Sequence, residues 1–299
     1  MLKIYQVIFL ILFFNSVALA DTSSQLKLMT MYHSIKNKQV DLLEEQMLHI
    51  KSDVSKTRMQ ADVYAIKTYD FKTLTDKLRV PSRWCDFITL HLNIKACTYQ
   101  LKPDQALSFF AGRKFYEAAD DAYELRYQFK VDHADEKFLK LQLAAAEGPF
   151  GTQDYLIVLE SLKIGHEVVL HLSLSYQTSF SSRLGTSVYL STIGADKVGF
   201  SKITANDGGG QYIGGIEGII ERNVMRYFLA LATYLNHDSA TLGMPRHWFL
   251  STEKYARQLH EVALQDYLAA KKQEYKQQRS MQKNINARAA LKTALEADQ

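Results

Sequence analysis

Apolar and polar side chains alternate along the middle of the chain, from about residue 106 to residue 204. The clearest run is Glu124–Val131, in which every second residue from Leu125 onward is apolar. This period of two is typical of a strand with one buried face. Similar alternation, or a short and uniformly apolar run, predicts further strands at Lys137–Ala145, Tyr155–Leu162, Glu167–Gln177, Ser187–Ile193 and Lys197–Ile203. Because no helical pattern separates these runs, we expect an antiparallel meander.

A strand and two short helices are predicted immediately before the meander. Gln60–Thr68 alternates as a strand does. Asp70 has the right chemistry to cap a short helix through Leu78, because its carboxylate accepts hydrogen bonds from free backbone N–H groups. Pro81 suits the first position of the next helix, which carries Trp84 on its inner face.

Apolar stripes with steps of three and four residues predict longer helices on both sides of this region. Ile216–Leu235 has such a stripe and forms the longest predicted helix of the core. A last helix is predicted from about Arg246 to Met281, amphipathic at first and then basic and glutamine-rich, so that its end is expected to be solvated. Residues 21 to about 56 are predicted to form an amphipathic helix after a loose start, from the spacing of Leu42, Leu43, Met47, Ile50 and Val54.

The first twenty residues have the pattern of a secretory signal peptide. Lys3 gives a positive start, Ile4–Val17 is mostly apolar, and Ala18-Leu19-Ala20 is a small-residue cleavage site before Asp21. The alternative is a membrane anchor, but the apolar run is shorter than the ~20 residues that a bilayer requires. We therefore expect cleavage near Ala20 and export, to the periplasm in a bacterium.

Composition and charge exclude some classes of partner. The formal net charge of +4 is too small to predict a nucleic-acid-binding surface. No later apolar segment reaches the length of a membrane span. His166-Glu167-Val168-Val169-Leu170-His171 departs from the zincin spacing, and no glycine-rich nucleotide motif occurs, so we predict no metal and no cofactor.

The chain has two cysteines, Cys85 and Cys97. An oxidising compartment would favour a disulfide between them. The alternative is a pair of buried free thiols, since free cysteine is often found in protein cores.

The order of the predicted elements defines the fold class. It is a strand, two short helices, about six antiparallel strands and one long helix, which predicts an α+β fold with a curved antiparallel sheet gripping a long C-terminal helix. Extra helices are expected at both ends. The corresponding division is a signal peptide (1–20), an N-terminal helical segment (21–58), a helix-grip domain (59–237) and a C-terminal helical extension (238–299).

Three segments carry a resemblance to a known superfamily: Pro81–Asp86, His91–Cys97 and Gly215–Tyr227. They look like uncharacterised exported bacterial proteins of the START-like, or SRPBCC, helix-grip superfamily. The resemblance covers about Gln60 to Asn236. It implies a cavity between sheet and helix, but no common catalytic motif.

A cavity in such a fold would be lined by inward residues of the long strands and by one face of the long helix. Tyrosines are frequent at these positions, and with one asparagine they form the predicted ligand site: Tyr127, Tyr155, Tyr176, Tyr189, Asn223 and Tyr227. An apolar pocket with several hydroxyls suits an amphipathic molecule such as a lipid, a quinone or a terpenoid. The alternative is that each tyrosine is an ordinary core residue.

Two arginines on the long helix are candidates for holding the ligand's head group. Arg222 and Arg226 are four residues apart and share a helix face, so they could bind a carboxylate or phosphate together. The alternative is that they are solvated or pair with carboxylates at the end of the sheet.

The sequence thus predicts an exported protein that binds a hydrophobic or amphipathic small molecule, with no catalytic residue assigned. A second reading is a cyclase or isomerase in which His91 or Glu221 acts as acid or base in the same cavity. A third is an envelope interaction module whose C-terminal helix, with Lys271, Lys272, Lys276 and Arg279, contacts a protein or an anionic membrane surface.

Overall fold

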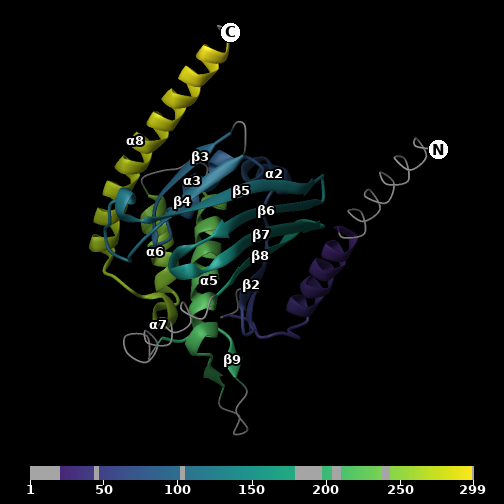
Figure 1. The fold of residues 1–299 in the computed structure, drawn as a ribbon. Coiled ribbons are helices and arrows are strands. Elements are labelled where there is room, and N and C mark those ends of the chain that lie inside the picture. Colours follow the sequence, from purple (N-terminus) through teal and green to yellow (C-terminus); the bar gives the residue numbers. More distant parts are fainter. Residues whose placement is uncertain are drawn as a thin grey trace, which may run out of the picture.

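The body of the protein is an eight-stranded antiparallel sheet with the strand order β1-β2-β8-β7-β6-β5-β4-β3 (Figure 1). The structure is a computed structural model that describes residues 21–43, 47–101, 105–178, 197–203, 210–237 and 243–297. The strands are β1 (Leu48–Val54), β2 (Arg58–Lys67), β3 (Ile94–Gln100), β4 (Ala106–Ala111), β5 (Tyr123–Ala134), β6 (Phe138–Glu147), β7 (Gln153–Ile164) and β8 (Glu167–Gln177). A separate two-stranded ribbon pairs β9 (Lys202–Ile203) with β10 (Gln211–Tyr212).

Helices cover both faces and one edge of the sheet. They are α2 (Phe71–Leu78), α3 (Pro81–Ile88), α5 (Gly215–Leu235), α6 (Met244–Glu253), α7 (Ala256–Leu259) and α8 (Leu264–Ala297), with single 3-10 turns η1 (Ala119–Asp121) and η2 (Pro149–Gly151). Residues 21–36 form a further helix. Among the described residues, no helix is both long and apolar enough to cross a membrane.

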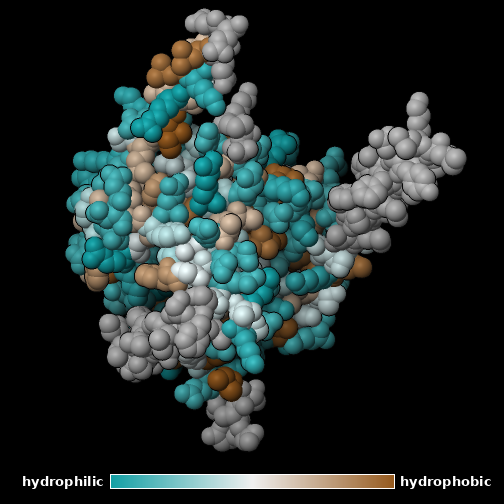
Figure 2. Space-filling view, in the orientation of Figure 1, coloured by the Kyte–Doolittle hydropathy of each residue, from teal (hydrophilic) through white to brown (hydrophobic). Residues whose placement is uncertain are grey.

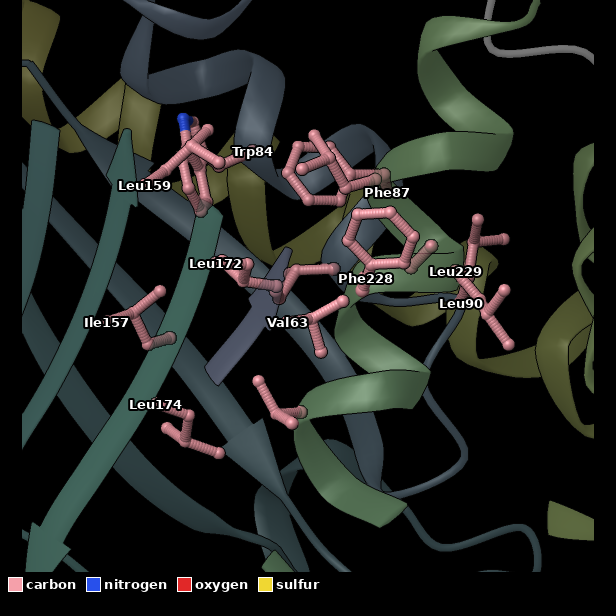
Figure 3. Packing of buried hydrophobic residues seen from close by; sticks show 14 of the residues in the cluster. Val63, Trp84, Phe87, Leu90, Ile157, Leu159, Leu172, Leu174, Phe228 and Leu229 are labelled. Carbon is pink, nitrogen blue, oxygen red and sulfur yellow. The ribbon is translucent and has the colours of Figure 1, made fainter. Parts of the chain in front are cut away.

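The main core lies between the sheet and α5, which contacts β1, β2 and β8. Figure 3 shows Phe228 of α5 close to Phe87 of α3 and to Val63 and Leu172 of the sheet. Trp84 adds a fully buried ring, and its indole N–H donates to the Leu78 carbonyl at 2.9 Å. The fold class predicted from the sequence is therefore confirmed: a curved antiparallel sheet grips a long helix.

The helix at residues 21–36 covers the opposite face of the sheet. A second apolar cluster there joins Leu28 and Ile35 to Tyr64, Phe138 and Val169. At one end of this helix, Tyr32 donates a hydrogen bond to Glu167 at 2.7 Å. The sheet is thus buried on both sides over part of its area.

Several predicted elements are confirmed. The strand over 60–68 is β2, and the strands of the meander are β5 to β8. The Asp70 carboxylate caps α2 by accepting from the Thr73 N–H at 2.9 Å, and Pro81 begins α3. The strand predicted at Ser187–Ile193 lies outside the described residues, and the one at Lys197–Ile203 is reduced to the two residues of β9.

The helix predicted to continue to residue 56 is wrong, because residues 48–54 form the edge strand β1. Met47, Ile50 and Val54 have helical steps of three and four, but Leu48 and Ile50 also fit a period of two. Pairing with β2 decides between the patterns, since Leu48 lies opposite Ala65 and Ile50 opposite Val63, where both are buried. The sheet therefore starts before residue 59, within the segment predicted to be helical.

The single C-terminal helix predicted from 246 to 281 is also wrong, because the chain forms α6, α7 and α8 in succession. The break falls at Tyr255, whose backbone is not helical, and at His260, which is extended. This turn lets α6 contact α5 while α8 contacts β3 at the sheet edge. The far end of α8 projects from the body, with Leu291 and Leu295 65% and 67% exposed (Figures 1 and 2).

The glutamine-rich part of α8 covers the open edge of the sheet. Gln278 accepts a hydrogen bond from the Cys97 N–H at 2.9 Å. One turn later, Gln282 accepts from the Tyr99 N–H and donates to the Tyr99 carbonyl, at 2.9 and 3.0 Å. These amides occupy backbone groups of β3 that an edge strand otherwise offers to other chains. The expectation of a solvated end therefore holds only beyond this part of α8.

Candidate functional site

Four tyrosines surround a partly open cavity of about 150 Å³ between the sheet and α5. Tyr127 comes from β5, Tyr155 from β7, Tyr176 from β8 and Tyr227 from α5. Asn223 lies one helical turn before Tyr227 and lines the same cavity. The remaining lining residues are His91, Asn93, Ile94, Phe109, Ala111, Leu125, Pro149 and Leu174. The structure thus brings together five of the six predicted ligand-binding residues, and Tyr189 lies outside the described residues.

Strand periodicity and register place the aromatic rings on this one face. Alternate residues of a strand point to the same side, so the cavity receives Leu125 with Tyr127 from β5 and Leu174 with Tyr176 from β8. The β7–β8 pairing brings the rings of Tyr155 and Tyr176 into a stack with centroids 4.9 Å apart. The result is a cavity with aromatic walls.

The tyrosine hydroxyls give these walls a polar component. Burial raises the pKa of Tyr127, Tyr176 and Tyr227, so their hydroxyls stay protonated. Tyr155 shares a hydrogen bond with the Thr152 hydroxyl at 2.8 Å. None of the other three hydroxyls is hydrogen-bonded to a residue in the described part of the chain. They therefore remain able to donate to, or accept from, a bound molecule.

Among the described residues that line this cavity, His91 carries the one imidazole. Its side chain is only 2% exposed and stacks on the ring of Tyr227, with centroids 4.4 Å apart. Its Nδ1 atom accepts a hydrogen bond from the Asn93 N–H at 3.1 Å. Burial, reinforced by Arg226 and nearby lysines, holds the pKa of the imidazole well below its usual value. His91 is therefore neutral near pH 7.

Covalent and polar links from both directions hold the loop that carries His91. A disulfide joins Cys85 of α3 to Cys97 of β3, with Cα atoms 5.1 Å apart, and so closes a loop around His91. From α8, the Lys271 ammonium donates to the His91 carbonyl at 2.8 Å, and the Tyr267 hydroxyl donates to the Leu90 carbonyl at 2.9 Å. The C-terminal extension is thus part of what positions the cavity wall.

The two arginines predicted to hold a head group do not line the cavity. Both are buried, at 4% and 3% exposure. Arg222 donates to the Val198 carbonyl at 3.2 Å, and Arg226 forms an ion pair with Glu261 at 2.9 Å. On α5, Asn223 and Tyr227 line the cavity. The two arginines lie on the adjacent face of the helix, which packs against the segments that contain Val198 and Glu261. Arg226 thus pairs with a carboxylate between α7 and α8, not one at the end of the sheet, and neither arginine is placed to hold a head group in this cavity.

Glu221, the other acid–base candidate of the sequence, is also outside the cavity lining. Its carboxylate is fully buried and accepts hydrogen bonds from Ser52 and from the backbone N–H groups of Phe200 and Ser201. It therefore serves to join α5 to β1 and to the segment before β9.

A second cavity, of about 260 Å³, lies toward the C-terminal end of α5. Its lining includes Lys67, Tyr69, Asn236 and Lys254. Burial and the neighbouring Lys254 lower the pKa of Lys67. The second cavity is larger than the tyrosine cavity, but one of its lining residues, Lys254, is exposed on the surface. We therefore regard the tyrosine cavity, with its buried and converging polar groups, as the candidate functional site.

A buried Asp–His–Glu cluster lies on the opposite face of the sheet. His171 of β8 contacts Asp62 of β2 at 2.7 Å through Nε2 and Glu160 of β7 at 2.9 Å through Nδ1. The ring of Tyr64 stacks on His171 at 4.2 Å. All four residues are less than 5% exposed. In the described part of the chain, no group of histidine, cysteine and acidic residues is arranged to hold a metal ion. The cluster therefore ties three strands together and is closed to substrates.

This cluster should make the protein sensitive to acid. Burial raises the pKa of Glu160, but its hydrogen bond and charge interaction with His171 outweigh burial and lower the pKa from 4.5 to about 2. Because the folded pKa is below the unfolded one, this stabilisation is complete above about pH 4.5 and is lost as the pH falls toward 2. We expect the titration of Glu160 to lower the free energy of unfolding by about 2 kcal/mol between pH 6 and pH 3.

Urea unfolding at pH 6 and pH 3 measures this loss. Glu160→Gln removes the titrating group, so its stability should fall less over the same interval than that of the unsubstituted protein. Glu147→Gln, at the exposed end of β6, is the matched control and should keep the full dependence. Equal pH dependence in Glu160→Gln and in the unsubstituted protein would contradict the assignment.

The likenesses of this chain to known proteins are confined to distant solved structures. No protein-family model matches the chain, and no curated protein matches it significantly in sequence. Among solved structures, truncated norcoclaurine synthase from Thalictrum flavum is 11% identical over 46% of this chain and 84% of that one, with a TM-score of 0.32. CalU16 from Micromonospora echinospora is 9% identical over 72% of this chain and 98% of that one, with a TM-score of 0.31. Ara h 8.0201 is 9% identical over 49% and 91%, with a TM-score of 0.27. At these values the likenesses carry no functional argument.

Proposed function

We propose that the protein binds a small amphipathic ring compound in the cavity between the sheet and α5. The observation that carries this proposal is the convergence of Tyr127, Tyr155, Tyr176 and Tyr227, from three strands and one helix, on a single cavity. Aromatic walls favour a ring, and the hydroxyls give it polar partners. Convergence is what separates a binding site from tyrosines that merely fill the core.

The volume of the cavity limits the size of the buried part of the ligand. An engineered apolar cavity of about 150 Å³ in another protein takes up a single benzene ring. The cavity here has the same volume, about 150 Å³. A gap of about 10 Å³, which is too small for a further ring, lies next to Tyr227 and between Trp84, Phe87 and Leu172. Figure 3 shows these three side chains close to one another in the core. We therefore infer that one ring enters, rather than a whole lipid chain or a sterol.

The lining favours binding over catalysis. Of the described residues that surround the cavity, the ionisable ones are His91 and the four tyrosines, and the tyrosines stay protonated. A cyclase or isomerase needs a base to remove a proton, most often a histidine or a carboxylate. No carboxylate is among the described residues that line the cavity, and the Nδ1 atom of His91 already accepts a hydrogen bond from the Asn93 N–H. Glu221, which was a candidate, is held by four hydrogen bonds elsewhere in the fold.

We also propose that this binding takes place outside the cytoplasm. The pattern of residues 1–20 supports export. The Cys85–Cys97 disulfide supports it independently, because structural disulfides persist mainly in oxidising compartments. Both arguments agree with a periplasmic protein in a bacterium.

Filling the cavity tests the proposal. Ala111 lines it, and Ala111→Leu places three additional carbon atoms where the ring would bind. With acetophenone as the probe, we expect the unsubstituted protein to show saturable shifts of backbone amide NMR signals around the cavity. Ala111→Leu should weaken this binding about tenfold or more, since the added atoms compete for the same space.

Ala144→Leu is the matched control, because it adds the same atoms to an exposed position of β6. It should bind acetophenone as the unsubstituted protein does. Unchanged binding in Ala111→Leu, or shifts that map away from the cavity, would overturn the proposal. Solvent extraction of the purified protein, followed by mass spectrometry, then identifies any natural ring compound that it carries.

A further inference from the structure

We infer that His91 selects the ligand: its Nε2–H group donates a hydrogen bond to a carbonyl oxygen carried by the bound ring. This inference rests on the proposed function and specifies the chemical class of ligand. The ligand would be a single-ring aromatic aldehyde or ketone, or the ring end of a larger molecule that carries such a group.

The hydrogen bonds of the loop fix the tautomer of His91. A backbone N–H can only donate, so the bond from the Asn93 N–H requires an unprotonated Nδ1 atom. A neutral imidazole carries its single proton on one nitrogen. The proton of His91 is therefore on Nε2, so this nitrogen can donate a hydrogen bond and cannot act as a base.

This donor has no partner within the protein. The Nε2 atom of His91 is buried and forms no hydrogen bond to any described residue. Buried donors are nearly always paired, and one left unpaired is destabilising. Since His91 lines the cavity, an acceptor atom on the bound molecule can satisfy this donor.

The charges around His91 favour an electron-rich acceptor. On one side, Lys95 and Lys271 share the single carboxylate of Glu274, at 3.0 and 2.7 Å. On the other side, Glu261 is contacted by three cations, namely Arg226, Lys114 and Lys197. Among the described residues these five cations contact two carboxylates, and a positive field of this kind stabilises partial negative charge on an oxygen. A carbonyl oxygen provides that charge without the desolvation cost of a full anion.

The remaining walls suit the ring to which the carbonyl is attached. Tyr227 stacks on His91 at 4.4 Å, and Tyr155 stacks on Tyr176 at 4.9 Å. A conjugated ring can lie against these faces while its oxygen reaches Nε2. A saturated chain would lose the stacking, and a hydrocarbon ring would leave the His91 donor unpaired.

Two probes of nearly equal shape test the hydrogen bond directly. Acetophenone has a carbonyl oxygen where α-methylstyrene has a CH₂ group, so the pair differs in the acceptor alone. We expect the unsubstituted protein to bind acetophenone about tenfold more tightly, because an unpaired buried donor penalises the hydrocarbon. Titrations followed by NMR or calorimetry give both affinities.

Two variants of His91 separate its two ring nitrogens. In His91→Asn the amide oxygen can replace Nδ1 as the acceptor for the Asn93 N–H, but no donor reaches the position of Nε2. In His91→Gln the amide N–H₂ reaches that position. We expect the preference for acetophenone to fall to about twofold or less in His91→Asn and to remain several-fold in His91→Gln.

An NMR measurement on the unsubstituted protein keeps the inference testable if a variant does not fold. Long-range ¹H–¹⁵N correlation spectra report the tautomer of each histidine ring, and His91 should show the Nε2–H form. Its Nε2 signal should move on addition of acetophenone and much less with α-methylstyrene.

The outcomes distinguish this inference from the proposed function. Equal binding of both probes, a preference that survives in His91→Asn, or an Nδ1–H tautomer would overturn the role of His91 while leaving ring binding in place. Binding of neither probe to the unsubstituted protein would overturn the proposed function, and the inference with it.

Discussion

Replacement of Glu221 by alanine is expected to lower the free energy of unfolding by about 4 kcal/mol, because it leaves buried donors without a partner. The Glu221 carboxylate accepts from the Phe200 and Ser201 N–H groups at 2.6 and 2.9 Å. It also accepts from the hydroxyls of Ser201 and Ser52 at 2.7 and 2.8 Å. No water replaces it easily, since the side chain is fully buried.

The effect should be specific to this carboxylate and not to the helix. Glu217 lies one turn earlier on α5, with no hydrogen bond to another described residue, so Glu217→Ala should cost less than about 1 kcal/mol. Glu221→Gln keeps the shape but turns an N–H₂ group toward the donors, and should lie between the two. Urea unfolding followed by circular dichroism measures all three. A Glu221→Ala protein as stable as Glu217→Ala would contradict the structural role and return Glu221 to the list of catalytic candidates.

The parts of the fold that the sequence predicts well are those in which local pattern and tertiary environment agree. β8 matches the predicted strand Glu167–Gln177 at both ends, because its period of two faces a buried layer on one side and the His171 cluster on the other. α5 matches because its apolar stripe has a whole sheet face to cover. Along both β8 and α5, the tertiary environment stays the same from one end of the element to the other.

The errors fall where a distant partner decides the outcome. Leu48–Val54 carries both helical and strand spacing, and only pairing with β2 selects the strand. The glutamines of α8 look like a solvated surface in the sequence, but they bond the backbone of β3, more than 180 residues earlier in the chain. A four-residue spacing between Gln278 and Gln282 is the signal that could have indicated a polar contact with a strand edge.

The candidate site could be predicted in part. Three of the tyrosines occupy inward strand positions, which the period of two identifies, and Tyr227 lies on the face of α5 that the sheet covers. The protonation and orientation of His91 could not be predicted, because they depend on Asn93 two residues away and on Lys271, which is 180 residues later. The spacing of Arg222 and Arg226 predicts that they share a helix face, but not which way that face points. Asn223 and Tyr227 line the cavity, whereas the arginines contact segments that pack beside α5.

Replacement of Glu274 by alanine should destabilise the protein by about 3–5 kcal/mol, the range found when one partner of a buried ion pair is removed. Glu274 lies between two buried ammonium groups, Lys95 at 3.0 Å and Lys271 at 2.7 Å, whose side chains are 1% and 7% exposed. Asp76 pairs with Lys72 at 2.6 Å on the surface, so Asp76→Ala is the control and should cost less than about 1 kcal/mol.

The pH dependence of this loss identifies its cause. Burial lowers the pKa of Lys271 from 10.5 to about 8, even though Glu274 opposes the shift. Between pH 8 and 10.5 the folded protein therefore binds fewer protons than the unfolded chain, and stability rises with pH. Without Glu274 the pKa falls further, so the Glu274→Ala protein should regain more stability between pH 7 and pH 9 than the unsubstituted protein does. Equal gains would show that lost packing, and not an uncompensated charge, explains the effect. Because Lys271 also donates to the His91 and Ile94 carbonyls, the same variant should weaken acetophenone binding.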